Sequence, residues 1–305
     1  MSLLCSCGLP GRLKFHPTSQ YFCSSCFSRK FEKRILNQIP RFVRGNSIAV
    51  ALSGGKDSAT LLHVLHKTQR KLKITKLMAI ILEEGILELQ LARKKIINKL
   101  KKNYSDIDFI KTSYSELFDY SLPTLVQHSD NQGLGFTPCA ICGVLRRHGI
   151  MRLALENEAD FIAMGNTLED EADTILLNII RGTPWKNSRG KIDYQPADRK
   201  SLPLRIKPLA RISENAILNY SKIHQLPILT NQCVFAYRSL RSDISIFLNS
   251  IEEKNPHVRY SITSSMEEDT KRDRIVKVVQ KCERCSSYSP EFECAACRMI
   301  QKIMN

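Results

Sequence analysis

Short apolar runs in the first two thirds of the chain are separated by segments with helical periodicity. The runs lie at residues 48–52, 77–82, 108–111 and 161–164. Apolar residues at helical spacing follow the first, second and fourth runs, as with Leu61, Leu62 and Leu65. This alternation predicts an α/β fold in which helices cover both faces of a parallel sheet.

The same pattern assigns the remaining segments. Further predicted helices cover residues 27–38, 213–224, 240–251 and 259–281. The helix after the fourth run has acidic residues near its start, and one of its faces carries Ala172, Ile175, Leu176, Ile179 and Ile180. Residues 181–205 are polar and include Lys186 and Arg189, so we predict a long mobile loop there.

Charge and hydropathy narrow the class of protein. The chain has 46 Lys and Arg against 30 Asp and Glu, a formal net charge of +16. This excess favours a polyanionic partner, because basic groups release counterions from phosphates; a solvated basic surface is the alternative. No apolar run approaches the roughly 20 residues that span a bilayer. The N-terminal residues do not resemble a secretory signal, so we expect a cytoplasmic protein with reduced thiols and no membrane partner.

Eleven cysteines fall into three groups with none left over. The N-terminal group is Cys5, Cys7, Cys23 and Cys26, the C-terminal group is Cys282, Cys285, Cys294 and Cys297, and the middle group is Cys139, Cys142 and Cys233. Each terminal group offers four thiolates in paired spacing, which is typical of structural zinc sites. The Cys5–Cys7 pair is one residue shorter than usual, and His16 is an alternative ligand there. We therefore predict two structural Zn²⁺ ions per chain.

A glycine-rich loop joins the first predicted strand to its helix. Residues 53–58 read Ser-Gly-Gly-Lys-Asp-Ser. Glycines let backbone N–H groups approach phosphate, Lys56 adds a positive charge, and Asp57 is placed to hold Mg²⁺. The segment resembles the pyrophosphatase loop (PP-loop) of the N-type ATP pyrophosphatases. In that family the loop binds the β- and γ-phosphates while a substrate oxygen attacks the α-phosphate of ATP. A plain strand-to-helix turn is the alternative.

The middle cysteines suggest sulfur or metal chemistry. Cys139 and Cys142 form a C-x2-C motif at a predicted helix start, where the helix dipole is expected to lower the pKa of both thiols. Such a pair fits a redox couple or half of a zinc site. With Cys233 as a third ligand, the group fits an iron–sulfur cluster with one open iron, or thiols that carry persulfide sulfur.

Several stretches together resemble the catalytic subunits of the cytoplasmic tRNA 2-thiolation complex. They are the PP-loop, Glu84-Gly85-Ile86, Cys139-x-x-Cys142-Gly-Val-Leu-Arg-Arg, the stretch from Gly165 to Ala172, Cys233-Val-Phe-Ala and the terminal cysteine groups. They follow one another in the family's order across nearly the whole chain. The resemblance implies that ATP adenylates the C2 oxygen of a tRNA uridine, with position 34 favoured, and that sulfur then replaces it.

The resemblance also implies roles for single residues. Nucleotide binding falls to residues 53–58 and Gly165. Catalysis falls to Lys56, Asp57, Asp170, Cys139, Cys142 and Cys233. The three cysteines would hold a [4Fe–4S] cluster, and Arg146 and Arg147 would face the RNA. The implied partners are tRNA, a ubiquitin-like sulfur carrier and a paralogous non-catalytic subunit.

Two departures from the family pattern affect this interpretation. Glu83 stands where the family has Asp, and Gly165-Asn166-Thr167 with Glu169 replaces Gly-His-Asn with Asp. A non-catalytic tRNA-binding subunit and a different PP-loop synthetase are therefore the alternative functions.

The predicted organisation has four parts. An N-terminal zinc-binding module covers residues 1–30, the PP-loop domain residues 31–255, a helical connector residues 256–281, and a C-terminal zinc-binding module residues 282–305.

Overall fold

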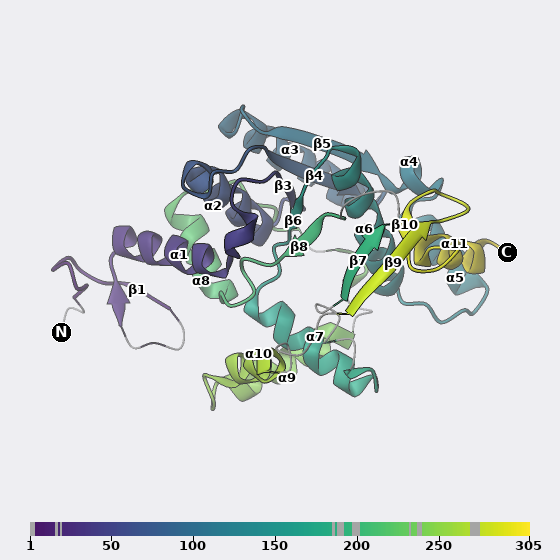
Figure 1. Ribbon diagram of the computed structural model, residues 1–305. Helices are drawn as coiled ribbons and strands as arrows, with labels where there is room; N and C mark the ends of the chain where they lie inside the picture. The colour runs from purple at the N-terminus through teal and green to yellow at the C-terminus, as the bar shows by residue number, and fades with distance from the viewer. Residues whose placement is uncertain are drawn as a thin grey trace.

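The computed structural model describes the greater part of the chain. The described residues are 4–15, 18, 20–184, 187, 192–196, 202–231, 233–236, 240–268 and 275–305, with backbone alone at 192–196, 266–268 and 275–277. His16, Lys186 and Arg189 lie outside them, so the roles proposed for these residues stay predictions. Figure 1 shows the N-terminal module at one end of the molecule and the C-terminal module at the other.

A parallel sheet of five strands forms the centre of the molecule. Its order is β5-β4-β3-β6-β8. The strands are β3 (Ile48–Ala51), β4 (Leu77–Glu83), β5 (Asp108–Ser113), β6 (Phe161–Ala163) and β8 (Leu204–Ile206). The first four confirm the predicted strands and the α/β class. β8 was not predicted, because it lies inside the segment assigned to a loop.

Helices cover both faces of this sheet. The N-terminal half of the chain contains α1 (Ser24–Gln38), η1 (Arg41–Val43), α2 (Lys56–Leu72), α3 (Leu87–Asn103), α4 (Tyr114–Phe118) and α5 (Leu122–Asn131). The other half contains α6 (Pro138–Glu156), α7 (Leu168–Ile180), α8 (Glu214–Ile223), α9 (Leu240–Glu252), α10 (Val258–Glu268) and α11 (Ala295–Met304). Strand alternation divides the core, because Ile48 and Val50 face one cluster with α1, α2 and α8 whereas Ala49 faces another with α5, α6 and α11.

Small strands complete the two ends of the chain. A hairpin of β1 (Leu13–Lys14) and β2 (Tyr21–Phe22) precedes α1. A second sheet has the order β10-β9-β7, with β7 (Ile192–Pro196), β9 (Ile275–Lys281) and β10 (Tyr288–Ser289). β7 and β9 pair in parallel, although 82 residues separate Ile192 from Asp193's neighbouring partner strand only in sequence and not in space.

Two predictions about these segments were wrong. The connector at 256–281 is helical only in its first part, because Ile-Val-Lys-Val-Val at 275–279 is rich in β-branched residues and pairs with β7 and β10. The segment 181–205 contains β7 and β8. Both are short strands whose stability comes from pairing with distant strands, a signal that local periodicity does not carry.

The buried face of α7 also differs from the prediction. Ala172 is buried as expected, but Ile179 and Ile180 are 49% and 58% exposed. Asp173 takes an inner position instead, 4% exposed, because Arg259 of α10 lies 2.7 Å from its Oδ1. A paired carboxylate can occupy a buried position that would exclude an unpaired one.

Candidate active site

The PP-loop lies between the end of β3 and the start of α2. Gly54 has a φ of 86°, a conformation that side chains disfavour. Ser53 and Ser58 close the loop: their hydroxyl oxygens are 3.1 Å apart, and the Ser53 N–H donates to Ser58 Oγ at 3.2 Å. No side chain caps the N-terminus of α2. Its first N–H groups therefore remain suited to binding phosphate oxygens.

Gly165 lies against the PP-loop from the end of β6. A Cβ atom at this position would stand 3.2 Å from the backbone nitrogen of Ser58 and 3.3 Å from its Cα. The absence of a side chain thus allows the two backbones to approach closely. This geometry explains Gly165 by packing of the loop rather than by a contact that its own atoms must make with nucleotide.

Lys56 and Asp57 stand at the start of α2 beside Glu214, the first residue of α8. Lys56 Nζ lies 2.8 Å from Glu214 Oε2 and 3.2 Å from Asp57 Oδ1. Burial lowers the pKa of Lys56, but the hydrogen bond to Glu214 and the charges of both carboxylates outweigh it and raise that pKa. Lys56 is therefore a firmly charged ammonium group at the phosphate loop.

Asp57 has properties suited to a divalent cation. Burial raises its pKa to about 6, with the charges of Glu214 and Asp170 adding to the shift and Lys56 opposing it. Its Oδ1 is buried and accepts no hydrogen bond. A carboxylate oxygen left without a donor, close to other carboxylates, fits Mg²⁺, which also keeps several waters of its own.

The acidic start of α7 has a structural role that the sequence also suggested. Asp170 and Thr167 form a capping box, with the Asp170 N–H donating to Thr167 Oγ1 at 3.2 Å and the Thr167 N–H donating to Asp170 Oδ2 at 3.2 Å. Arg241 lies 3.2 Å from Asp170 Oδ1. Glu169 accepts the Glu214 N–H at 3.0 Å, and burial raises its pKa to about 7. Glu169 therefore holds α8, and with it Glu214, beside Lys56.

A cavity of about 200 Å³ connects the PP-loop to two of the middle cysteines. Its lining includes Ser53 and Gly55 at the loop, and Cys142 and Cys233 on the other side. Leu229, also in the lining, donates its backbone N–H to Gly54 O at 2.8 Å. Residues that are 180 positions apart in sequence thus share one space. The phosphate loop and the thiols can act on the same substrate.

Glu84 and two arginines form the floor of this cavity. Glu84 is 4% exposed and receives Arg93 Nη1 at 2.9 Å and Arg146 Nη2 at 2.8 Å. Burial raises the pKa of Glu84, but the charges of Arg146 and Arg93 outweigh it and lower that pKa. Arg146 also donates to Cys142 Sγ at 3.2 Å. The position predicted to face RNA is thus a link between a buried carboxylate and a thiol.

Cys142 does not have the lowered pKa that its helix position predicted. Its Sγ is buried among Tyr114, whose oxygen lies 3.3 Å away, and Arg146. Burial raises the pKa of the Cys142 thiol, although the charge of Arg146 opposes this effect. The position lies a full turn inside α6, where the helix dipole is already weak and desolvation dominates.

The other middle-group residues take different positions. Cys139 lies in the first turn of α6 and is exposed, whereas Cys233 is half-buried in the cavity wall. Cys139 does not line the cavity. Arg147 is exposed, and its carbonyl accepts a hydrogen bond from Arg205 at 3.3 Å. The structure therefore joins Cys142 and Cys233 to one cavity and leaves Cys139 at the outer end of the same helix.

Each terminal cysteine group converges on one point. Within the described part of the chain, these two groups alone bring three or more such ligand atoms within 4.8 Å of one another. Sulfur–sulfur distances are 3.6 Å for Cys7–Cys23 and 3.7 Å for Cys285–Cys294. Tetrahedral zinc with bonds of about 2.3 Å places its sulfur ligands about 3.8 Å apart. Both groups fit such an ion, and Cys5 and Cys7 both take part despite their short spacing.

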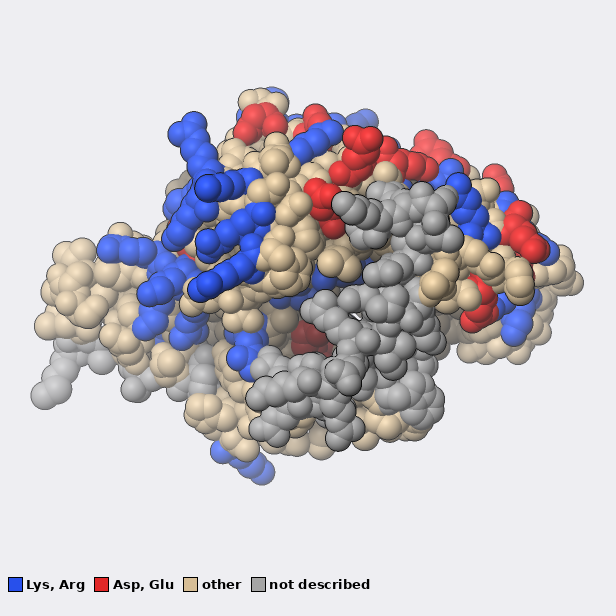
Figure 2. Space-filling view, viewed as in Figure 1, with Lys and Arg blue, Asp and Glu red and all other residues tan. Residues whose placement is uncertain are grey.

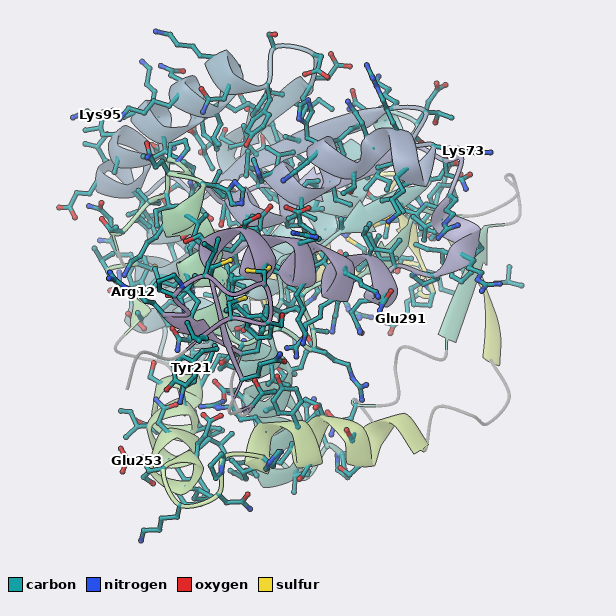
Figure 3. The ribbon with its side chains drawn as sticks, turned by 90° about the vertical axis from the view of Figure 1, so that its left-hand side faces the viewer. Arg12, Tyr21, Lys73, Lys95, Glu253 and Glu291 are labelled. Atoms are coloured by element: carbon teal, nitrogen blue, oxygen red, sulfur yellow. The ribbon has the colours of Figure 1, made fainter. Side chains whose placement is uncertain are left out.

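Basic side chains gather on one part of the surface. Figure 2 shows Lys and Arg concentrated around α1 and α2, whereas both charges mix elsewhere on the same face. In Figure 3, sulfur atoms of the N-terminal module cluster between the Arg12 segment and the start of α1, beside these basic residues. The N-terminal module therefore adjoins a surface suited to a polyanion.

Sequence reasoning missed Glu214 and Arg93 as site residues and used Glu84 only as part of a motif. Glu214 follows Ser213 at a helix start and gives no local sign of its partner, because Lys56 is 158 positions away. Arg93 reads as one basic residue in a helix rich in them. Only the burial of Glu84 beside it shows that it is paired.

Comparison with known proteins agrees with this geometry. The strand, glycine loop and helix that bind phosphate define a PP-loop protein, and the sequence model of the PP-loop domain family matches residues 26–238. Among the described residues, no helix combines the length and apolar character needed to cross a bilayer.

Relatives with curated names specify the family further. Cytoplasmic tRNA 2-thiolation protein 1 of Drosophila virilis is 32% identical over 302 residues, covering 97% of this chain and 86% of the relative. A probable sulfurtransferase of Methanocaldococcus jannaschii is 27% identical, covering 99% and 88%. The structure of the U34-tRNA thiolase NcsA from Methanococcus maripaludis, with its [4Fe–4S] cluster, shares the fold at a TM-score of 0.82, 24% identity and coverage of 99% and 97%. The chain belongs to the cytoplasmic tRNA 2-thiolation protein 1 family of PP-loop proteins.

Proposed function

We propose that this protein is an ATP-dependent tRNA sulfurtransferase that converts a uridine, at position 34, into 2-thiouridine. The observation that supports this most is the shared cavity, because it places PP-loop residues and the sulfur atoms of Cys142 and Cys233 around one substrate-sized space. The names of the relatives agree with this reaction.

In the first half-reaction, ATP binds with its phosphates on residues 53–58. The uridine C2 oxygen attacks the α-phosphorus, the bond from this phosphorus to the bridging oxygen breaks, and pyrophosphate leaves. Lys56 stabilises the charge that develops on the leaving phosphates, since it lies at the N-terminus of α2. Asp57 would hold Mg²⁺ through its unpartnered Oδ1. Glu214 keeps the ammonium group of Lys56 in place until phosphate replaces it.

In the second half-reaction, sulfur at the oxidation level of sulfide attacks C2, and AMP leaves with the former uridine oxygen. Cys139, Cys142 and Cys233 would hold a [4Fe–4S] cluster, which supplies an iron site for that sulfur when bound. Arg146 positions Cys142 and keeps its thiolate form accessible by offsetting charge. Arg93 and Glu84 in turn fix Arg146.

The terminal groups would each hold one structural Zn²⁺, since four thiolates complete its coordination and leave no open position. Two further partners belong to the proposal: a ubiquitin-like sulfur carrier and a paralogous non-catalytic subunit. The domain limits at residues 30, 255 and 281 and a cytoplasmic location complete it. The location has the support of the relatives' names.

A non-catalytic tRNA-binding subunit is the competing function. The complete PP-loop and the two thiols on its cavity favour the enzyme, because a subunit that only binds RNA needs neither. The test combines purified protein, an unmodified tRNA transcript, MgATP and a sulfide source. Wild type should release AMP and pyrophosphate only with tRNA present, and nucleoside analysis should detect 2-thiouridine. Binding of tRNA without release of AMP, under conditions in which the cluster is loaded anaerobically, would favour the competing function.

A further inference from the structure

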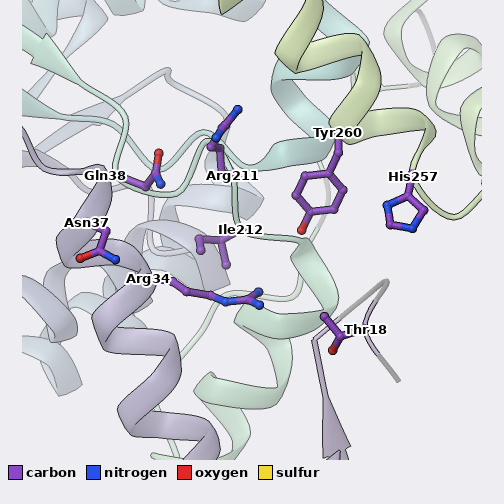
Figure 4. A pocket seen from close by; sticks show the side chains of 8 residues that line it. All are labelled: Thr18, Arg34, Asn37, Gln38, Arg211, Ile212, His257 and Tyr260. Carbon is purple, nitrogen blue, oxygen red and sulfur yellow. The ribbon is translucent and has the colours of Figure 1, made fainter. Parts of the chain in front are cut away.

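A second cavity, of about 450 Å³, lies away from the PP-loop between α1, the segment before α8, and α10. Figure 4 shows Arg34, Asn37 and Gln38 projecting from α1, and Tyr260 approaching from α10. Arg211 enters from the segment that leads, three residues later, to Glu214. The volume falls within the range of about 300–1,000 Å³ that small-molecule sites occupy.

The charge of this cavity favours an anion. Two guanidinium groups, Arg34 and Arg211, line it, and its lining contains no carboxylate. Arg34 is half-buried and forms no ion pair within the part of the chain that the structure describes. Its guanidinium carbon lies 4.1 Å from the Phe15 ring centroid, which fixes the side chain. Burial lowers the pKa of Arg34, as expected where a cation is desolvated without an opposite charge.

The other lining groups suit the remaining parts of a nucleotide. Tyr260 offers a half-buried aromatic ring, and a base can stack on such a ring irrespective of its identity. Asn37 and Gln38 carry amides, which both donate and accept hydrogen bonds. Proteins recognise RNA chiefly through unpaired nucleotides whose bases stack on aromatic or arginine groups.

We propose that this cavity binds one unpaired nucleotide of the substrate RNA, with its phosphate on Arg34 and Arg211 and its base against Tyr260. The proposal rests on the proposed function, because it assumes an RNA substrate. The cavity is distinct from the one that holds the PP-loop, so the RNA would be held at two places. The segment from Arg211 to Glu214 connects the two cavities directly, since Glu214 pairs with Lys56.

The first test measures the affinity of purified full-length variants for an unmodified tRNA transcript. Tyr260→Ala should weaken binding by about tenfold, whereas Tyr260→Phe should retain it, because only the ring is needed for stacking. Arg34→Gln should weaken binding and reduce the slope of log affinity against log salt by about one. Arg41→Gln is the matched control, since Arg41 is exposed near the same helix but does not line the cavity.

A second measurement does not depend on variant folding. Arginine modification of the wild-type protein by phenylglyoxal, located by mass spectrometry, should show Arg34 protected by bound tRNA and Arg41 much less so. Variants that bind tRNA as well as Arg41→Gln, together with an unprotected Arg34, would overturn the subsite. If wild type binds tRNA through Arg34 but never adenylates it, the proposed reaction fails and the subsite stands. If thiolation occurs with unchanged KM in the variants, the reaction stands and the subsite fails.

Discussion

The two four-cysteine modules have the same ligand set but are attached to opposite faces of the sheet. The N-terminal module joins the core cluster that contains α2 and α8, through Phe15, Phe22 and Phe27. The C-terminal module contributes Cys282 and Cys294 to the cluster that contains α5 and α6. One module therefore supports the helix that follows the PP-loop. The other supports the helix that carries the catalytic thiols.

The modules also differ in how deeply their ligands are buried. In the N-terminal group Cys5 is buried and Cys7 is exposed, whereas Cys282 and Cys294 are each 2% exposed. His148 of α6 lies 3.6 Å from the sulfur atoms of both Cys285 and Cys294. Metal at the C-terminal group would thus be tied to the catalytic domain by a side chain of that domain. Identical ligands can therefore serve a peripheral module at one end and an integral one at the other.

The largest expected effect separates the two faces functionally. Cys142→Ala should abolish formation of 2-thiouridine but leave ATP binding and the melting temperature nearly unchanged, because the PP-loop contains no cysteine. Lys56→Ala should instead lower the rate of AMP formation by about 100- to 1,000-fold. Nucleoside analysis and ATP affinity report the two results. The same loss is expected for Cys139→Ala and Cys233→Ala, and full thiolation by Cys233→Ala would remove it from the site.

Loss of a metal ligand should affect the two ends unequally. Cys282→Ser should release metal and lower the free energy of unfolding of the catalytic domain by several kcal/mol, since a structural zinc site contributes folding energy directly. Cys26→Ser should also release one metal ion but leave α6 and the thiol site folded. Elemental analysis, expected at two zinc ions in wild type, and urea unfolding measure both effects. Equal destabilisation by the two variants would contradict the comparison.

His148 gives a sharper test of the C-terminal attachment. Its ring should donate an N–H to the metal-bound thiolates, so His148→Ala should weaken zinc binding at this end by about 10- to 100-fold. Competition with a chromophoric chelator measures the affinity. His128→Ala is the control, because that ring bonds only to Thr124 O of its own helix. If Co²⁺-loaded His148→Ala showed a changed ligand number, His148 would be a direct ligand and the outer hydrogen bond would be wrong.

The smallest expected effect concerns pH at the ATP side. The pKa of Asp57 is raised to about 6, so its carboxyl group gains a proton as the pH falls through 6. Mg²⁺ needs the ionised form, and MgATP affinity should therefore fall by up to about tenfold for each pH unit below 6. Asp57→Asn should bind MgATP weakly without this inflection. Cys142→Ala should keep the wild-type inflection, because Cys142 belongs to the other face.

Several parts of the fold and site were predictable from local sequence. Four strands of the main sheet, the PP-loop and both terminal cysteine groups follow from short patterns: apolar runs, a glycine loop before a helix, and paired cysteines. Each of these signals lies within a few residues of chain. Its physical cause, such as burial of a parallel strand or completion of a tetrahedral shell, acts largely on those residues themselves.

Other features depended on contacts between distant segments, which only the folded chain brings together. β8 and β9 are strands because β6 and β7 pair with them, and Glu214 is a site residue because Glu169 holds α8 beside Lys56. The raised pKa of Cys142 arises from burial that its helix position alone could not reveal. Local pattern determines which elements form and which ligands occur together. Burial and pairing across the sheet decide which of those groups share a cavity.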